Sequence, residues 1–321
     1  MNKHFYQRKT GISALALSLF LMISFLLSPF MFPVSMSNRL AKAETAVEEQ
    51  ISSYLAGYGI TDEEMDAQAE RIASTYSQYV DFEPNGRYLS LDPSLYDAEY
   101  RDAVEERNFD FDGANFTNEE LAMIGDMRTI YTNISIMNAL VDEELGYIDQ
   151  YGEFIFTQFD STMTARLRAW GYSIKWYKLS INLDSDLAIV FAAISLVTQI
   201  SLNWSDLGNV IRELTDRRCL ETCISGICAT MPDDTYRAVA YFSASKILEI
   251  YDILSVVSNA ISEANVLNKV INIIMSYLLP ELDDCIIVLY KALRFNHGAK
   301  LTMCWVPFFG TKFGLSIKTF R

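Results

Sequence analysis

Histidine is scarce in this chain, and this restricts the catalytic mechanisms open to it. The 321 residues include two histidines, His4 and His297, and His4 lies in an amino-terminal segment typical of export signals. A Ser-His-Asp or Cys-His mechanism would therefore have to use His297, with Cys285 and Cys304 the cysteines nearest to it in sequence. The pair His297-Gly298 also fits a helix end, where the dipole favours a cationic side chain and glycine stops the helix. We favour this structural role and predict no catalytic residue.

Other catalytic and cofactor motifs are missing from the sequence. We find no phosphate-binding loop, no dinucleotide-binding fingerprint and no H-E-x-x-H zinc motif. The chain has 41 Asp and Glu residues, so a hydrolase that uses two carboxylates stays an alternative, although nothing in their spacing selects a pair. We predict no cofactor.

One acidic stretch resembles a calcium-binding loop. Asp81, Glu83 and Asn85 occupy alternate positions, Gly86 is sixth and Asp92 is twelfth, as the oxygen ligands and sharp turn of an EF-hand loop require. The stretch departs from that loop because Pro84 interrupts it and because an aspartate replaces the usual bidentate glutamate. Alternating apolar residues on both sides of Pro84-Asn85-Gly86 instead favour a β-hairpin over residues 79–91.

The five cysteines lie in the second half of the chain. They are Cys219, Cys223, Cys228, Cys285 and Cys304. In an exported protein some are expected to pair, each bridge contributing about 2–4 kcal/mol, and an odd number leaves at least one thiol or an intermolecular bridge. The first three lack the C-x2-C spacing of structural zinc sites.

Charge divides the chain near Ala165. Residues 44–165 contain 27 acids, 5 arginines and no lysine, a net charge of −22, whereas residues 166–321 contain 14 acids and 16 bases, a net charge of +2. We therefore predict an acidic helical module with hairpins over 44–165 and a second module over 166–321. The acidic module would repel phosphates, which argues against nucleic-acid binding.

The amino terminus predicts export. A basic start is followed by an apolar run from Gly11 to about Phe32, and Ala41-Lys42-Ala43 supplies small residues at the positions that a signal peptidase requires. We expect residues 1–43 to be a signal peptide cleaved between Ala43 and Glu44, giving a secreted or extracellular protein of 278 residues. The alternative is an uncleaved helix that anchors the protein, because the run is long enough to span a bilayer.

The apolar periodicity predicts an α+β fold that is mostly helical. In the acidic module it indicates helices over 62–79 and 94–107, a long helix opened by the capping box Thr117–Glu120, and a second hairpin over 147–157 that turns at Tyr151-Gly152.

In the second module we expect a single strand over 170–183, bulged near Tyr177-Lys178, and an apolar helix over 187–202 capped by Asp184 or Ser185. A long helix from Asp233 or Asp234, helices over 264–279 and 281–293, and a strand pair over 300–320 should follow. The early strand and the final pair would form a three-stranded sheet covered by helices.

These features together resemble a loose group of uncharacterised secreted proteins of Gram-positive bacteria. The resemblance rests on the hairpin from Tyr79 to Leu91, on the strand Trp170-Gly171-Tyr172 to Ser180 that leads into the apolar helix, and on the final strand pair with Trp305 and Pro307. Some such proteins resemble bacteriocins in layout. The resemblance implies export and carries no functional residues.

Two main functions follow as expectations. The first is a non-enzymatic secreted protein that binds a partner or the cell envelope, and the second is a membrane-active, bacteriocin-like toxin. In the toxin, the apolar helix 187–202 and the amphipathic helices over 233–279 would contact the membrane. A core helix explains 187–202 better, because its charge-free stretch is shorter than the roughly 20 residues that span a bilayer. A hydrolase ranks third.

Overall fold

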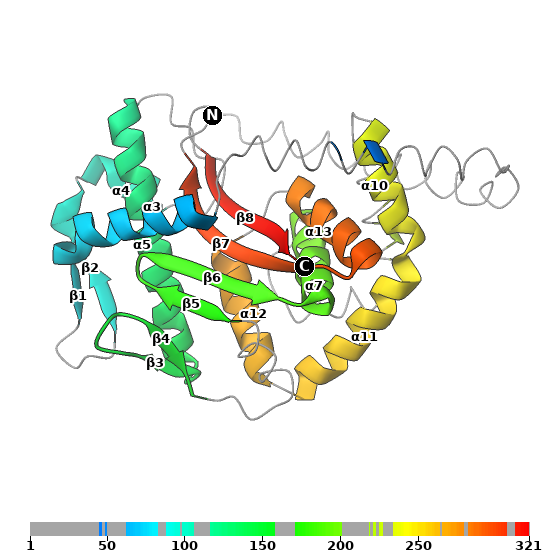
Figure 1. The fold of residues 1–321 in the computed structure, drawn as a ribbon. Helices are drawn as coiled ribbons and strands as arrows, with labels where there is room; N and C mark the ends of the chain where they lie inside the picture. The colour runs from blue at the N-terminus through cyan, green and yellow to red at the C-terminus, as the bar shows by residue number, and fades with distance from the viewer. Residues whose placement is uncertain are drawn as a thin grey trace, which may run out of the picture.

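A computed structural model describes the greater part of the chain after the amino-terminal segment. The described residues are 45–46, 49, 62–82, 88–96, 98–105, 116–157, 171–200, 218, 221–222, 225–226, 234–263, 265–278, 282–306 and 312–320. They form an α+β fold that is mostly helical, as the sequence predicts (Figure 1). The expected signal peptide and its cleavage site lie outside them.

The elements of the acidic half are short except for one helix. They are α3 (Asp62–Tyr76), η2 (Ser77–Tyr79), β1 (Val80–Phe82), β2 (Leu89–Leu91), η3 (Pro93–Leu95), α4 (Ala98–Glu105), α5 (Asn118–Asp142), β3 (Gly146–Ile148) and β4 (Phe154–Phe156). The strands pair as two antiparallel hairpins, β1 with β2 and β3 with β4. Both predicted hairpins are therefore confirmed.

In the second half, two strands are followed by a run of helices and then by two further strands. Its elements are β5 (Tyr172–Lys175), β6 (Lys178–Leu183), α7 (Ser185–Ile200), α10 (Asp234–Ser245), α11 (Ile247–Glu263), α12 (Asn265–Tyr277), α13 (Leu282–Phe295), β7 (Gly298–Val306) and β8 (Lys312–Phe320). The strands form one antiparallel sheet in the order β5-β6-β7-β8, at the centre of Figure 1.

The prediction of one bulged strand over 170–183 is wrong. Lys175 pairs with Lys178, so Trp176 and Tyr177 form a two-residue turn between two antiparallel strands. The apparent slip in the alternation marks this turn. The sheet therefore has four strands rather than three.

The long helix predicted from Asp233 or Asp234 is divided at Lys246 into α10 and α11. Two serine hydroxyls donate to carbonyls of the preceding turn near the division, Ser243 to Val239 (3.0 Å) and Ser245 to Phe242 (2.7 Å). Such bonds compete with the helix ladder and commonly bend helices, which explains the interruption.

One hydrophobic cluster joins the two halves of the chain. It contains Met137 and Leu140 of α5, Leu179 and Ile181 of β6, and Ile287 of α13, all buried. On β6 and β7, alternate residues such as Ile181 and its partner Leu301 supply the apolar face, while Ser180 and Thr302 pair on the opposite face. The two predicted modules thus share a core, and the boundary near Ala165 stays a prediction.

Helix α5 begins and ends with recognisable capping motifs. The predicted capping box is confirmed: Thr117 Oγ1 accepts from the Glu120 amide (3.3 Å), and the Glu120 carboxylate accepts from the Thr117 amide (2.7 Å). This bond lowers the pKa of Glu120. At the other end the Leu145 and Glu144 amides donate to Leu140 and Val141 carbonyls, a Schellman arrangement.

Glu144 adopts the left-handed conformation in this cap, with φ 58°. Glycine usually occupies the position because a side chain there costs about 1–2 kcal/mol. A carboxylate is also unfavourable at the helix end where the dipole is negative. The cap is therefore strained in two ways.

We predict that Glu144→Gly raises the free energy of unfolding by about 1 kcal/mol, because glycine relieves the backbone strain and the change removes a negative charge. Glu144→Ala is the matched control, since it removes the charge but keeps the strain, and should stabilise less. Thermal and urea unfolding measure both. A Glu144→Gly protein no more stable than Glu144→Ala would contradict the strain.

Candidate functional site

The residues of the possible calcium loop form a hairpin and a cap. Asp81 is exposed on β1 opposite Ser90, and the Asp92 carboxylate accepts from the Ser94 amide (2.8 Å) at the start of η3. That bond lowers the pKa of Asp92. Glu83 and Asn85 lie outside the described residues. Within the described part of the chain, no three His, Cys, Asp or Glu side chains gather as a metal site would require.

The cysteines are only partly described. Cys285 is a buried thiol on α13. Cys304 lies on β7 opposite Gly314, and its side chain is outside the described set, as are Cys219, Cys223 and Cys228. Disulfide pairing therefore stays a prediction.

His297 follows the end of α13, as expected, but Asn296 ends the helix. Asn296 has φ 55°, and its amide donates to the Ala292 carbonyl (3.0 Å), the pattern of a left-handed cap. The prediction of Gly298 as the stop is wrong, because asparagine tolerates this conformation and Gly298 already begins β7. Cys285 lies 10 residues before Phe295 on α13, about 15 Å along the axis, so it cannot pair with His297.

A buried carboxylate links α3 to α5. Asp126 is 2% exposed, and its Oδ1 accepts from Arg71 (2.6 Å) while its Oδ2 accepts from the Tyr76 hydroxyl (3.2 Å). The ion pair, through its hydrogen bond, raises the pKa of Arg71. With both oxygens committed to protein donors, Asp126 suits a structural link better than a catalytic base.

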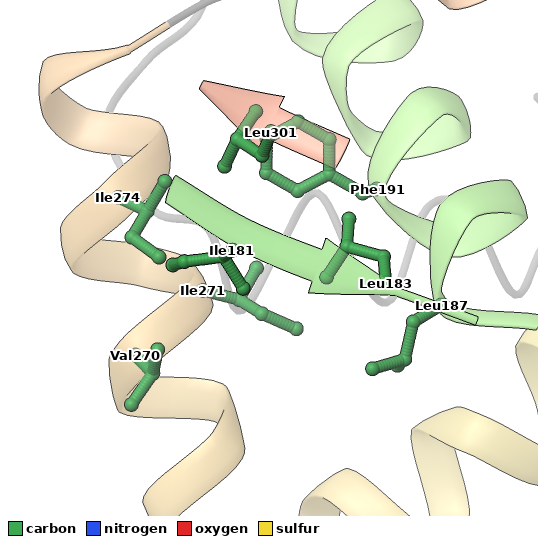
Figure 2. A pocket seen from close by; sticks show the side chains of 8 residues that line it. All are labelled: Ile181, Leu183, Leu187, Phe191, Val270, Ile271, Ile274 and Leu301. Carbon is green, nitrogen blue, oxygen red and sulfur yellow. The ribbon is translucent and has the colours of Figure 1, made fainter. Parts of the chain in front are cut away.

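One apolar cavity lies between the sheet and the helices that cover it. Its volume is about 30 Å³, and Figure 2 shows its lining side chains, which come from β6, β7, α7 and α12: Ile181, Leu183, Leu187, Phe191, Val270, Ile271, Ile274 and Leu301. Ligand pockets usually measure roughly 300–1,000 Å³. This cavity is therefore a small packing gap within the core.

The strongest candidate is a surface of exposed aromatic side chains on the two small hairpins. Tyr151 is 73% exposed, Tyr147 52% and Phe82 42%. We call these three residues the hairpin surface. Phe82 ends β1, Tyr147 lies on β3, and Tyr151 lies in the turn between β3 and β4. Aromatic residues of this size are enriched where proteins bind partners.

The turn that carries Tyr151 is held by its own backbone. Asp149 Oδ1 accepts from the amides of Tyr151 (2.9 Å) and Glu153 (3.0 Å), and the Gly152 amide donates to the Asp149 carbonyl (3.0 Å). Asp149 therefore closes the turn as aspartate commonly does. The turn presents Tyr151 outward in a defined position.

The β3–β4 turn also contacts the β5–β6 turn and the end of β1. Gly152 lies against Trp176 in the β5–β6 turn, with Phe82 beside it. Lys175 pairs with Glu153 (3.2 Å). Burial opposes the charge on Lys175, but the Glu153 carboxylate and the Tyr177 hydroxyl group outweigh burial and raise the pKa of Lys175. These contacts fix the β3–β4 hairpin, which carries Tyr147 and Tyr151, against the β5–β6 turn.

Sequence reasoning located the Tyr151-Gly152 turn but missed its role. The sequence predicts that Tyr147, Tyr151 and Phe82 belong to hairpins. It contains 41 aromatic residues (19 Phe, 18 Tyr and 4 Trp), and it does not show which of them stay exposed after folding. Exposure depends on contacts between distant hairpins. The only available signal was an aromatic residue within a predicted turn.

We predict that Gly152→Ala lowers the free energy of unfolding by about 1–3 kcal/mol. Gly152 has φ +70°, and a Cβ there would lie 2.7 Å from Trp176 Cδ1. Gly226→Ala is the matched control, because a Cβ at Gly226 meets nothing within 4 Å. Chemical denaturation compares them. Equal effects of the two substitutions would show that the Gly152–Trp176 contact is unimportant.

We predict that Tyr76→Phe flattens the loss of stability at high pH. Burial, with the Asp126 charge, raises the pKa of Tyr76 from 10.0 to about 12. The folded protein therefore holds this proton more tightly, a contribution of up to about 2 kcal/mol that is complete below about pH 10 and is lost as pH rises towards 12. Urea unfolding at several pH values measures the slope. Tyr151→Phe, which removes an exposed phenol, is the matched control, and equal slopes in Tyr76→Phe and Tyr151→Phe would refute the assignment.

No protein-family model matches the chain, and no curated protein or solved structure is significantly similar to it, so the functional argument rests on the geometry of the chain's own residues.

Proposed function

We propose that this is an exported, non-enzymatic protein that binds a partner through the hairpin surface. The observation that carries the proposal is the exposure of Tyr151, Tyr147 and Phe82 on two hairpins, one of which packs through Gly152 against Trp176. The amino-terminal pattern, with its basic start, apolar run and Ala41-Lys42-Ala43, supports export.

The physical basis is the low cost of binding with rigid aromatic side chains. Tyrosine offers a large contact area with two side-chain torsions, so little conformational entropy is lost when it is immobilised. Its hydroxyl can also hydrogen-bond with a partner while its ring packs. Since Asp149 and Gly152 already fix the turn, ordering the backbone adds little further cost.

The alternatives receive less support. The apolar helix of the toxin hypothesis, α7, is buried along most of its length, from Leu187 to Leu196, and packs against α13 and α11. No described helix combines the length and apolar character needed to cross a bilayer. The hydrolase alternative loses the Cys285–His297 pair, and several carboxylates serve as caps, including those of Asp92, Glu120 and Asp149.

Site-specific photo-crosslinking tests the proposal in the producing cells. A benzoylphenylalanine replacing Tyr151 should give a defined crosslinked product, identified by mass spectrometry, because a bound partner would lie within reach of the turn. The control places the same group at Tyr241 of α10, which is also exposed (41%) but lies on another part of the fold.

Serine substitutions in the hairpin surface test whether its aromatic side chains are required for the complex. Combining Tyr147→Ser with Tyr151→Ser should abolish the complex while leaving the circular dichroism spectrum and unfolding midpoint nearly unchanged, since both side chains are more than half exposed. The proposal fails if position 151 gives no product beyond that at position 241, or if the complex survives the double substitution in a folded protein.

A further inference from the structure

Exposed carboxylates lie close in the chain to residues of the hairpin surface. Asp142, Glu143 and Glu144 lie just before β3, which carries Tyr147, and Asp81 precedes Phe82 on β1, where successive side chains point to opposite faces. These residues belong to a segment, 44–165, that contains no lysine and a net charge of −22. The aromatic side chains are therefore presented in an acidic environment.

Three described lysines form ion pairs with carboxylates of this segment. Lys175 pairs with Glu153 (3.2 Å), Lys178 with Asp66 (2.6 Å) and Lys269 with Glu143 (2.6 Å). Each pair offsets one carboxylate of the segment 44–165, and Asp142 and Glu144 are not among those three carboxylates.

The end of α5 adds to the negative potential. Asp142 Oδ1 accepts from the Tyr88 hydroxyl (2.6 Å), a bond that leaves the carboxylate charge in place. The last carbonyls of a helix carry about half a unit of negative charge, so carboxylates here reinforce the dipole instead of offsetting it. Glu144 stands at this end despite its unfavourable φ of 58°.

From this charge distribution we propose that the hairpin surface binds a basic segment of another protein, rich in lysine or arginine. Tyr147, Tyr151 and Phe82 would pack against the aliphatic stems and guanidinium planes, while Asp142 and Glu144 would attract the charges. Anionic lipids, nucleic acids and anionic envelope polymers are repelled by the same field. This inference rests on the proposed function and names the chemistry of its partner.

Binding of simple repeating peptides to the full protein tests the inference. Dye-labelled peptides of equal length that repeat Lys-Thr, Gln-Thr or Glu-Thr are titrated by fluorescence anisotropy. The Lys-Thr peptide should bind, the other two should bind at least about tenfold more weakly, and affinity should fall several-fold between about 50 and 300 mM salt.

Matched variants separate this surface from general attraction to an acidic protein. Tyr147→Ser with Tyr151→Ser should weaken binding of the Lys-Thr peptide by about tenfold. Asp142→Asn with Glu144→Gln should weaken it about three- to tenfold, whereas Glu63→Gln with Glu70→Gln, which removes two exposed charges from α3, should change it less than twofold.

Each other outcome overturns the inference. If the Asp142/Glu144 and Glu63/Glu70 double variants weaken peptide binding equally, or if the Tyr147/Tyr151 double variant has no effect, the peptide is attracted only by the overall charge of the protein. Equal binding of the Gln-Thr peptide would mean that charge does not select the partner. If no peptide binds but the photo-crosslink at position 151 persists, only the basic partner is wrong; if the crosslink is also missing, the proposed function fails as well.

Discussion

The burial of α5 is the constraint on which the described structure depends. This 25-residue helix has buried residues on nearly every side, including Asp126, Arg128, Thr129 and Asn133. A polar group taken out of water must find a protein partner or it costs free energy. The neighbours of α5 are therefore positioned by its polar side chains as well as by its apolar ones.

The partners of the polar side chains of α5 come from three elements that are distant in sequence: α3, β2 and the β5–β6 turn. Asp126 binds Arg71 and Tyr76 of α3. The Asn138 side chain accepts from the Leu89 amide (3.1 Å) and donates to the Leu89 carbonyl (2.8 Å). It therefore satisfies both backbone groups of a β2 residue, as a neighbouring strand would.

Asn133 is completely buried, and its Nδ2 donates to the Trp176 carbonyl (3.4 Å) in the β5–β6 turn. Through these bonds the helix fixes both a hairpin and a turn. Gly152 then packs against Trp176, which brings the β3–β4 turn to the same place. The contacts of Asn133 and Gly152 with Trp176 therefore also fix the position of the turn that carries the exposed Tyr151.

The sequence by itself determined the local elements, because their signals lie within a few residues. The capping box of Thr117 and Glu120, the Asp184 cap of α7 and both small hairpins follow from spacing and turn residues. The structure was needed to show that residues 172–183 fold back as two strands, because Trp176 and Tyr177 are not typical turn residues. Long-range contacts decided that α7 is buried and which aromatic residues remain exposed. Sequence periodicity shows that a face is apolar, but only packing determines whether another element covers it.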